Sequence, residues 1–242
     1  MKYIMMCGGD YNEWETPKQL TKINGEILIE RTIRQLKENG ITDIAISTNN
    51  KAFDYLGIEI LHHNNKYNHN NYKKECTDSN YIWLNAYYPS SDPCCYLHGD
   101  VYFSDEAIKK IVNTKVEDTM FICTYDGTDA DRNPLNQKGR EPFGYIVNNQ
   151  VVFQYAIKKI KKMVDAGMFE NNLTPISWHL YRFLNGYDVK PEAKEYTEIN
   201  NIFQSIGDYL IIDDYTVDID TERDIKELEV RLNKGGGNNG NN

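Results

Sequence analysis

Residues 5–20 read MMCGGDYNEWETPKQL. They begin inside a short apolar run, Tyr3–Met6, which has the length and composition of a buried strand. Two glycines, Gly8 and Gly9, follow directly, and a proline and a lysine close the segment at Pro17-Lys18. Glycines let the backbone approach a ligand and expose its N–H groups, whereas proline stiffens the chain. The stretch therefore predicts either a ligand-binding loop that ends on a fixed cation or a tight turn after the first strand.

Strand-like and helix-like segments alternate over the first half of the chain. Short apolar runs predict strands at residues 3–6, 43–47, 58–61, 94–98 and 119–124. Apolar residues at helical spacing predict helices at residues 26–39 and 79–88, and a third helix that Ser104 caps. Because parallel strands need crossover connections, this order predicts a mostly parallel sheet covered by helices.

The order of elements then changes. Residues 144–147 and 151–153 flank Asn148-Asn149-Gln150, a pattern that predicts a β-hairpin. The elements predicted next are helices at residues 156–166 and 176–184, a strand at 209–212 and a helix at 221–232. The glycine- and asparagine-rich end, residues 235–242, is expected to be a disordered tail.

Composition argues against several classes of protein. The formal net charge of -9 and the lack of a Lys/Arg run argue against nucleic-acid binding. No apolar stretch approaches the roughly 18 residues of a membrane span, and the N-terminus lacks the layout of a signal peptide. The odd number of cysteines and their places in apolar runs favour buried free thiols, so we expect a cytoplasmic protein. The cysteines are Cys7, Cys76, Cys94, Cys95 and Cys123.

Three aspartates are candidates for holding a divalent cation. Asp100 follows the fourth predicted strand, at the strand end where open α/β sheets bind ligands; the alternative is a helix or turn cap. Asp218 and Asp220 are two residues apart on an extended segment, so their side chains share one face. Adjacent carboxylates repel each other unless a cation lies between them or one is protonated. The alternative is that Asp220 or Thr221 is the N-cap of the last helix, with Asp224 inside its first turn.

Together these motifs resemble those of the nucleotidyltransferases that make NDP-sugars and CDP-alcohols. Pro17-Lys18-Gln19-Leu20 matches the family's Pro-Lys-x-Leu, and Met5-Met6-Cys7-Gly8 stands where the family has Leu-Ala-Ala-Gly. The Gly-Asp after the fourth strand and Asp218-Ile219-Asp220-Thr221 before the last helix also match. The resemblance covers about residues 1–125 and 209–233, and it is closest to the small CTP:phosphocholine and phosphoglutamine-type cytidylyltransferases.

The resemblance implies an α/β fold: a single-domain Rossmann-like three-layer αβα sandwich with a mostly parallel mixed sheet. The domain would span residues 1–234 and contain a small β-hairpin and helical insertion, residues 126–208, that binds the acceptor. The implied activity is a Mg²⁺-dependent transfer from a nucleoside triphosphate, with CTP favoured, to a small phosphomonoester, releasing pyrophosphate. The acceptor would be a phospho-amino acid, a phosphocholine-like alcohol or a sugar phosphate, as in the synthesis of capsule or other cell-surface polysaccharides.

The resemblance also assigns residues. Lys18 and Asp100 would be catalytic, and Asp100, Asp218 and Asp220 would hold Mg²⁺. The residues implied for nucleotide binding are Met6, Cys7, Gly8, Gly9 and Ser79.

The acceptor phosphate needs a cation in a chain this acidic. Arg132 and Arg140 lie in a polar loop together with Lys138, and Arg can hold a phosphate through two contacts; the alternative is a solvated surface loop. Trp178 and Arg182 are four residues apart on a predicted helix and share a face. Both are candidates for a second wall of the acceptor site, although a tryptophan in such a place is also a common core residue.

One departure from the family pattern leaves other functions open. The family's arginine between the glycines and Pro17 is absent, and the acidic residues Asp10, Glu13 and Glu15 occupy the loop instead. The alternatives are a nucleotide-sugar-dependent glycosyltransferase, which usually carries Asp-x-Asp where this chain has Gly99-Asp100-Val101, and a non-catalytic nucleotide-binding protein. The sequence leaves the acceptor, the pathway and the oligomeric state undetermined.

Overall fold

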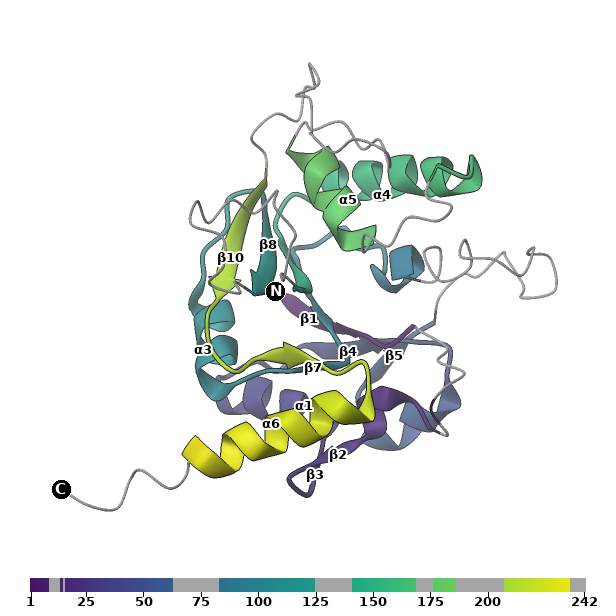
Figure 1. The fold of residues 1–242 in the computed structure, drawn as a ribbon. Helices are drawn as coiled ribbons and strands as arrows, with labels where there is room; N and C mark the ends of the chain where they lie inside the picture. Colours follow the sequence, from purple (N-terminus) through teal and green to yellow (C-terminus); the bar gives the residue numbers. More distant parts are fainter. Residues whose placement is uncertain are drawn as a thin grey trace.

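A seven-stranded mixed sheet forms the centre of the protein, seen in a computed structural model (Figure 1). The structure describes residues 1–8, 14, 16–62, 83–124, 141–168, 176–185 and 207–235. The strand order is β10-β8-β9-β6-β1-β4-β5. These strands are β1 (Lys2–Met6), β4 (Ile44–Ser47), β5 (Glu59–Leu61), β6 (Cys94–His98), β8 (Thr119–Thr124), β9 (Pro142–Val147) and β10 (Gly207–Ile212). All neighbours pair in parallel except β9, which runs antiparallel to both β6 and β8, so the predicted mostly parallel mixed sheet is confirmed.

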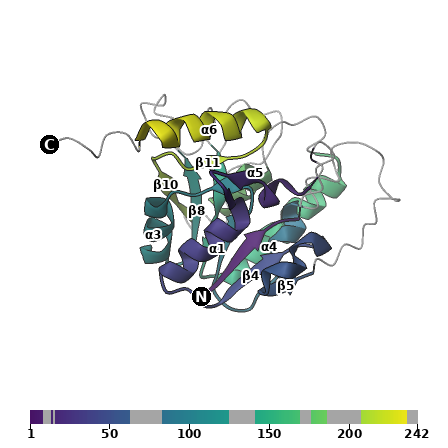
Figure 2. The same ribbon diagram turned by 90° about the horizontal axis from the view of Figure 1, so that it is seen from below.

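Helices cover both faces of the sheet and give the predicted three layers (Figures 1 and 2). One face packs against α1 (Leu28–Glu38) and α3 (Asp105–Asn113), and the other against α4 (Gln150–Asp165) and α5 (Ile176–Leu184). Side chains of β1 alternate between the two cores, because successive residues of a strand point to opposite faces. Ile4 and Met6 enter the core under α4 and α5, whereas Tyr3 and Met5 enter the core under α1 and α3.

A smaller apolar cluster attaches the last helix, α6 (Glu222–Gly235), to this sandwich. Its buried members come from α6, from the start of α1, from two short antiparallel pairs and from the residue that follows one of them: Ile23, Leu28, Tyr102, Ile219 and Leu228. The short pairs are β2 (Lys22–Ile23) with β3 (Glu26–Ile27), and β7 (Val101–Tyr102) with β11 (Val217–Asp218). Two 3-10 turns, η1 (Lys18–Leu20) and η2 (Lys51–Leu56), and a helical segment at residues 83–86 complete the described elements. The last of these lies within the helix predicted at residues 79–88.

The antiparallel contact between β6 and β9 depends on a glycine. Gly144 has φ +152°, and a Cβ at this position would lie 2.0 Å from the carbonyl oxygen of Tyr96. Any side chain would therefore push β9 away from β6. This close approach brings the start of β9 beside the end of β6, where the candidate site lies.

The predicted hairpin at residues 144–153 is wrong. Residues 151–153 belong to the first turn of α4, which starts at Gln150. The side-chain oxygen of Asn149 accepts a hydrogen bond from the N–H of Val152, so this asparagine caps a helix instead of forming a turn between strands. In contrast, the predicted cap of α3 is confirmed, because Ser104 Oγ accepts from the N–H of Ala107 at 2.8 Å.

Two further sequence predictions can be compared with the structure. Four of the five cysteines, Cys7, Cys94, Cys95 and Cys123, are buried free thiols, whereas Cys76 lies outside the described residues. Among the helices that the structure describes, none is long and apolar enough to cross a membrane. The tail predicted from residue 235 also lies outside the described part, apart from the last residue of α6.

Candidate active site

The ends of β1 and β6 lie side by side and bring two predicted motifs together. The strands are parallel neighbours with Met6 opposite His98, and the N–H of Gly99 donates to the carbonyl oxygen of Met6 at 3.0 Å. The residues that follow each strand, Cys7-Gly8 and Gly99-Asp100, therefore leave the sheet at the same place. This is the carboxyl edge at which open α/β sheets bind ligands.

Gly99 allows a third segment to approach this edge. A Cβ on Gly99 would lie 2.4 Å from Cys7 Sγ, 2.9 Å from the carbonyl oxygen of Met6 and 3.3 Å from Gln19 Cγ. The first two distances are shorter than real Cβ contacts, so a larger residue would displace β1 or the turn that contains Gln19. Glycine is required here because three pieces of chain meet where its side chain would be.

Lys18 is buried at the centre of this site. It opens η1, a turn that the N–H of Leu20 closes by donating to the carbonyl oxygen of Pro17 at 2.8 Å. Only 2% of the Lys18 side chain is exposed, and its Nζ lies 2.8 Å from Asp100 Oδ2 and 2.8 Å from Asp220 Oδ1. The structure thus brings together three residues that are 82 to 202 positions apart in the chain. The Asp100 side chain is 3% exposed and that of Asp220 is 70% exposed, so the first ion pair is buried and the second faces solvent.

The two-residue antiparallel pairing of β7 with β11 positions the carboxylates of Asp218 and Asp220. Asp218 lies opposite Val101, and the N–H of Ile219 donates to the carbonyl oxygen of Asp100 at 3.0 Å. The ladder therefore ties the segment that carries Asp218 and Asp220 directly to the main chain of Asp100.

Polar contacts at the start of α3 fix the chain just before β11. The N–H of Ser104 donates to Thr216 Oγ1 at 3.0 Å, and Ser104 Oγ donates to Asp214 Oδ2 at 2.5 Å. The N–H of Thr216 donates to Asp214 Oδ1 at 2.7 Å. These bonds attach the segment that leads to Asp218 to the start of α3.

Asp218 is in an unfavourable environment for an isolated carboxylate. Its Oδ1 is buried and has no hydrogen-bond partner in the part of the chain that the structure describes. Burial raises the pKa of Asp218 well above its ordinary value; the negative charge of Asp100 adds to the increase, and the Lys18 ammonium opposes it. A buried, unpartnered carboxyl oxygen beside other acids is suited to a cation.

Asp220 does not cap the last helix with its side chain. Thr221, directly before α6, performs that role instead: its Oγ1 accepts from the N–H of Asp224 at 3.4 Å. In return, Asp224 Oδ2 accepts from the N–H of Asp220 at 3.0 Å and from the N–H and Oγ1 of Thr221. The carboxylate of Asp220 therefore remains directed at Lys18. The cap alternative for the Asp220 side chain is therefore wrong, whereas its role in holding a metal stays a prediction.

The carboxylates of Asp100, Asp218 and Asp220 are suited to magnesium that is bound to a phosphate ligand. Among the described residues, no group of three or more His, Cys, Asp or Glu side chains forms a preformed metal site. The Lys18 ammonium lies between Asp100 and Asp220 instead. Carboxylate oxygens are nevertheless the ligands that Mg²⁺ prefers, and proteins commonly hold it by one or two carboxylates plus substrate phosphates and water. The buried oxygen of Asp218 would be one such ligand.

The remaining predicted nucleotide-binding residues are only partly described. Met6 and Cys7 are buried at the end of β1, and the N–H of Cys7 donates to the carbonyl oxygen of Ser47 at 2.9 Å, so this N–H already has a partner. Burial, followed by the charge of Asp100, raises the pKa of the Cys7 thiol well above its ordinary value. Gly8 follows at the surface of the site, half-buried. Gly9, Ser79, Arg132 and Arg140 lie outside the described residues.

The residues predicted on α5 are buried in the core. Trp178 is fully buried and packs edge-on against Phe121 with ring centroids 4.8 Å apart. Arg182 is 1% exposed on the same helix. Burial, followed by the charge of Arg182, lowers the pKa of His179 to about 3, so this imidazole is neutral. The structure therefore places Trp178 and Arg182 within the core under α5, and their role toward an acceptor stays a prediction.

Sequence reasoning missed two polar residues at the site. Glu141 precedes β9, and its Oε2 accepts from the N–H of Asp218 at 3.2 Å. Burial raises the pKa of Glu141. His98 is buried at the end of β6 with its ring 4.4 Å from that of Trp83, and burial lowers its pKa to about 4. The position of His98 two residues before Asp100 could have indicated its place at the site. Glu141 follows a sequence segment from which only Arg132, Lys138 and Arg140 were predicted to bind a ligand.

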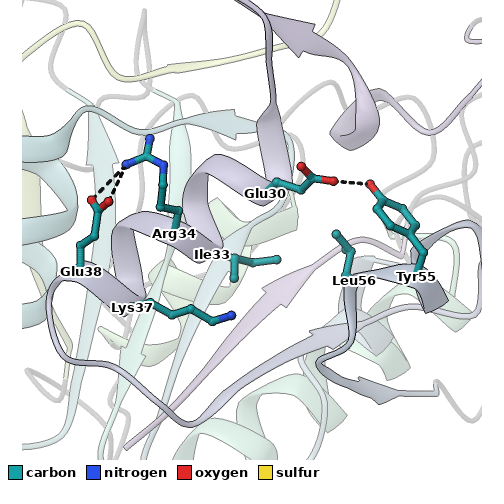
Figure 3. A pocket seen from close by; sticks show the side chains of 7 residues that line it. All are labelled: Glu30, Ile33, Arg34, Lys37, Glu38, Tyr55 and Leu56. Carbon is teal, nitrogen blue, oxygen red and sulfur yellow. Dashed lines mark hydrogen bonds and ion pairs between the residues drawn. The ribbon is translucent and has the colours of Figure 1, made fainter.

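A separate hollow lies on the outer side of α1, between this helix and η2 (Figure 3). Its volume is about 580 Å³. Two contacts join residues of its lining: Arg34 Nη1 lies 3.0 Å from Glu38 Oε2, and the Tyr55 hydroxyl donates to Glu30 at 2.8 Å. The lining residues are Glu30, Ile33, Arg34, Lys37, Glu38, Tyr55 and Leu56.

Comparison with known proteins supports the fold. No protein-family model matches the chain, and no curated protein does. The chain is similar in structure to 4-diphosphocytidyl-2C-methyl-D-erythritol synthase from Anaerococcus prevotii, with a TM-score of 0.52, 14% identity, and coverage of 96% of this chain and 95% of the other. A putative glucose-1-phosphate thymidylyltransferase from Bacillus anthracis gives a TM-score of 0.52 at 16% identity, covering 95% and 94%. The inositol-1-phosphate CTP transferase from T. maritima gives 0.51 at 13% identity, covering 97% and 96%. At these identities the likeness concerns the fold, and the Rossmann-like α/β fold implied by the sequence motifs is confirmed.

Proposed function

We propose that this protein is a nucleotidyltransferase that joins a nucleoside monophosphate to a small phosphomonoester and releases pyrophosphate. The observation that carries the proposal is the buried Lys18 ammonium, held between Asp100 and Asp220 at the carboxyl edge of the sheet. A fixed cation beside several carboxylates is suited to binding a triphosphate and a divalent metal together. The fold is shared with solved structures described as a diphosphocytidyl-methylerythritol synthase, a putative thymidylyltransferase and a CTP transferase.

The reaction needs positioning and charge stabilisation rather than a covalent enzyme intermediate. An oxygen of the acceptor phosphate attacks the α-phosphorus, the bond from this phosphorus to the bridging oxygen of the β-phosphate breaks, and its electron pair leaves with pyrophosphate. Lys18 would orient the α-phosphate and neutralise charge that develops on its oxygens. Because the attacking phosphate oxygen carries negative charge already, no general base is required.

Magnesium would be held by Asp100, Asp218 and Asp220, and when bound it would neutralise charge on the triphosphate. Glu141 would support this arrangement by accepting from the main chain of Asp218. We propose that the acceptor binds to the insertion of residues 126–208. Arg132 and Arg140 are the proposed cations for its phosphate. CTP is the favoured triphosphate because one similar structure is described as a CTP transferase and another as the synthase of a diphosphocytidyl compound.

Release of pyrophosphate tests the proposal. It is measured for four nucleoside triphosphates, each combined with choline phosphate, a sugar 1-phosphate or a phospho-amino acid. We expect release that requires both an acceptor and Mg²⁺, and that falls at least about a hundredfold in Lys18→Ala, the scale of losing one preorganised electrostatic contact. The control is Lys22→Ala, which removes an exposed lysine four residues away. Absence of release from every pair would contradict the proposal.

A further inference from the structure

The Lys18 ammonium occupies the position where the carboxylates of the site converge. It forms charge-assisted contacts of 2.8 Å to one oxygen of Asp100 and 2.8 Å to one oxygen of Asp220. Its side chain is 2% exposed, and the turn that carries it is packed against Gly99 through Gln19. Without nucleotide, the ammonium is therefore held between these acids, unlike that of a flexible lysine on a surface.

This position makes the ammonium a competitor of a free divalent ion. A metal ion that binds to Asp100 and Asp220 would come within a few ångströms of Nζ, and the two positive charges would repel each other in a largely buried site.

One ammonium does not neutralise all of these acids. Asp218 Oδ1 is buried without a hydrogen-bond partner in the described residues, and Glu141 adds a fourth carboxyl group next to it. The carboxylates of the site can therefore bind a metal cation when Lys18 pairs with another anion. A triphosphate supplies such an anion, because its oxygens carry several negative charges.

We propose that Lys18 is a specificity-determining residue that makes the site accept a metal–nucleoside triphosphate complex and exclude the free metal ion. In the absence of nucleotide, Lys18 stays paired with Asp100 and Asp220. When the complex binds, the ammonium moves to a phosphate oxygen and the two carboxylates become available to the metal. This inference rests on the proposed function, and it adds the species of substrate that the site recognises.

The test measures binding of Mn²⁺ by electron paramagnetic resonance, with and without a non-hydrolysable CTP analogue. Lys18→Met removes the charge and keeps the length of the side chain, so we expect free Mn²⁺ to bind about tenfold more tightly or better, since close charges at a partly buried site interact strongly. The Mn²⁺–analogue complex should bind about tenfold more weakly to the same variant, because the phosphate loses its cation. Lys18→Arg, which keeps the charge, should exclude free Mn²⁺ as the unmodified protein does.

Lys22→Met is the matched control, because it removes one positive charge at an exposed position close in sequence and should change neither affinity. Unchanged or weaker binding of free Mn²⁺ to Lys18→Met would overturn the inference. If Lys18→Met does not fold, Lys18→Gln provides the same comparison with a side chain that can donate to Asp100. Failure of the unmodified protein to bind the Mn²⁺–analogue complex would instead contradict the proposed function itself.

Discussion

Replacing Lys18 by methionine should destabilise the metal-free protein far more than neutralising Asp220. The two ion pairs of Lys18 have the same length of 2.8 Å but differ in burial: the Asp100 side chain is 3% exposed and that of Asp220 is 70% exposed. Removing one partner of a buried pair leaves an uncompensated buried charge and costs about 3–5 kcal/mol. Breaking an exposed pair costs under about 1 kcal/mol. The structure therefore predicts a large effect for Lys18→Met and a small one for Asp220→Asn.

Thermal unfolding followed by circular dichroism in EDTA measures this difference. The chain has 242 residues, and in domains of about this size each kcal/mol shifts Tm by about 2–4 °C. Lys18→Met should thus lower Tm by about 6–20 °C, whereas Asp220→Asn should lower it by less than about 4 °C.

A double variant separates loss of the ion pair from loss of packing. Lys18→Met combined with Asp100→Asn removes both charges. Its loss of unfolding free energy should therefore be smaller than the sum of the losses in the two single variants, by about 1–3 kcal/mol. Additive effects would show that Lys18 and Asp100 do not interact. Equal and small losses of Tm in Lys18→Met and Asp220→Asn would refute the buried ion pair on which the reasoning depends.

Three other perturbations test separate parts of the site. Asp218→Asn should stabilise the metal-free protein at pH 7.5. Because the native pKa of Asp218 is raised, protonated Asp218 stabilises the protein fully below the ordinary Asp value of about 3.9, and this contribution is lost as pH rises through the native pKa. The free energy of unfolding in urea should therefore depend less on pH in the variant. A destabilised variant at pH 7.5 would contradict this. Gly99→Ala should cost about 1–3 kcal/mol in urea unfolding and lower kcat, because the added Cβ meets Cys7 Sγ at 2.4 Å; adding Cys7→Ala should restore part of the loss. Arg140→Ala should raise the KM for the phosphomonoester while leaving the KM for the triphosphate unchanged, and equal small effects on both would assign this loop to the solvated surface.

The fold was largely accessible from the sequence because its signals are local. A buried β1 followed by glycines, the strand that ends in Gly99-Asp100 and the helix capped by Ser104 each lie within a few residues, and the structure contains all three. The error at residues 144–153 has the same local origin. A three-residue apolar run after Asn149 fits a strand or the first turn of a helix equally well, and only the contacts of α4 with the core decide between them.

The candidate site was less accessible because it depends on contacts between distant residues. The sequence motifs predicted that Lys18, Asp100 and Asp220 act together, but their salt bridges and the burial of the lysine require the two-residue pairing of β7 with β11. Such a short ladder has no pattern of its own in the sequence. The contact of Glu141 with the main chain of Asp218 likewise follows from where β9 starts relative to β11, which no local pattern specifies.

Phosphorus NMR of the reaction product tests the central claim most directly. The protein is incubated with CTP, Mg²⁺ and each phosphomonoester, and the spectrum is followed for two coupled phosphorus signals of a new pyrophosphate diester, together with free pyrophosphate. We expect both products in equal amounts with at least one acceptor, and neither with Asp100→Asn. A triphosphate that stays intact with every acceptor, or a nucleotide hydrolysed without joining the acceptor phosphate, would contradict nucleotidyl transfer at this site.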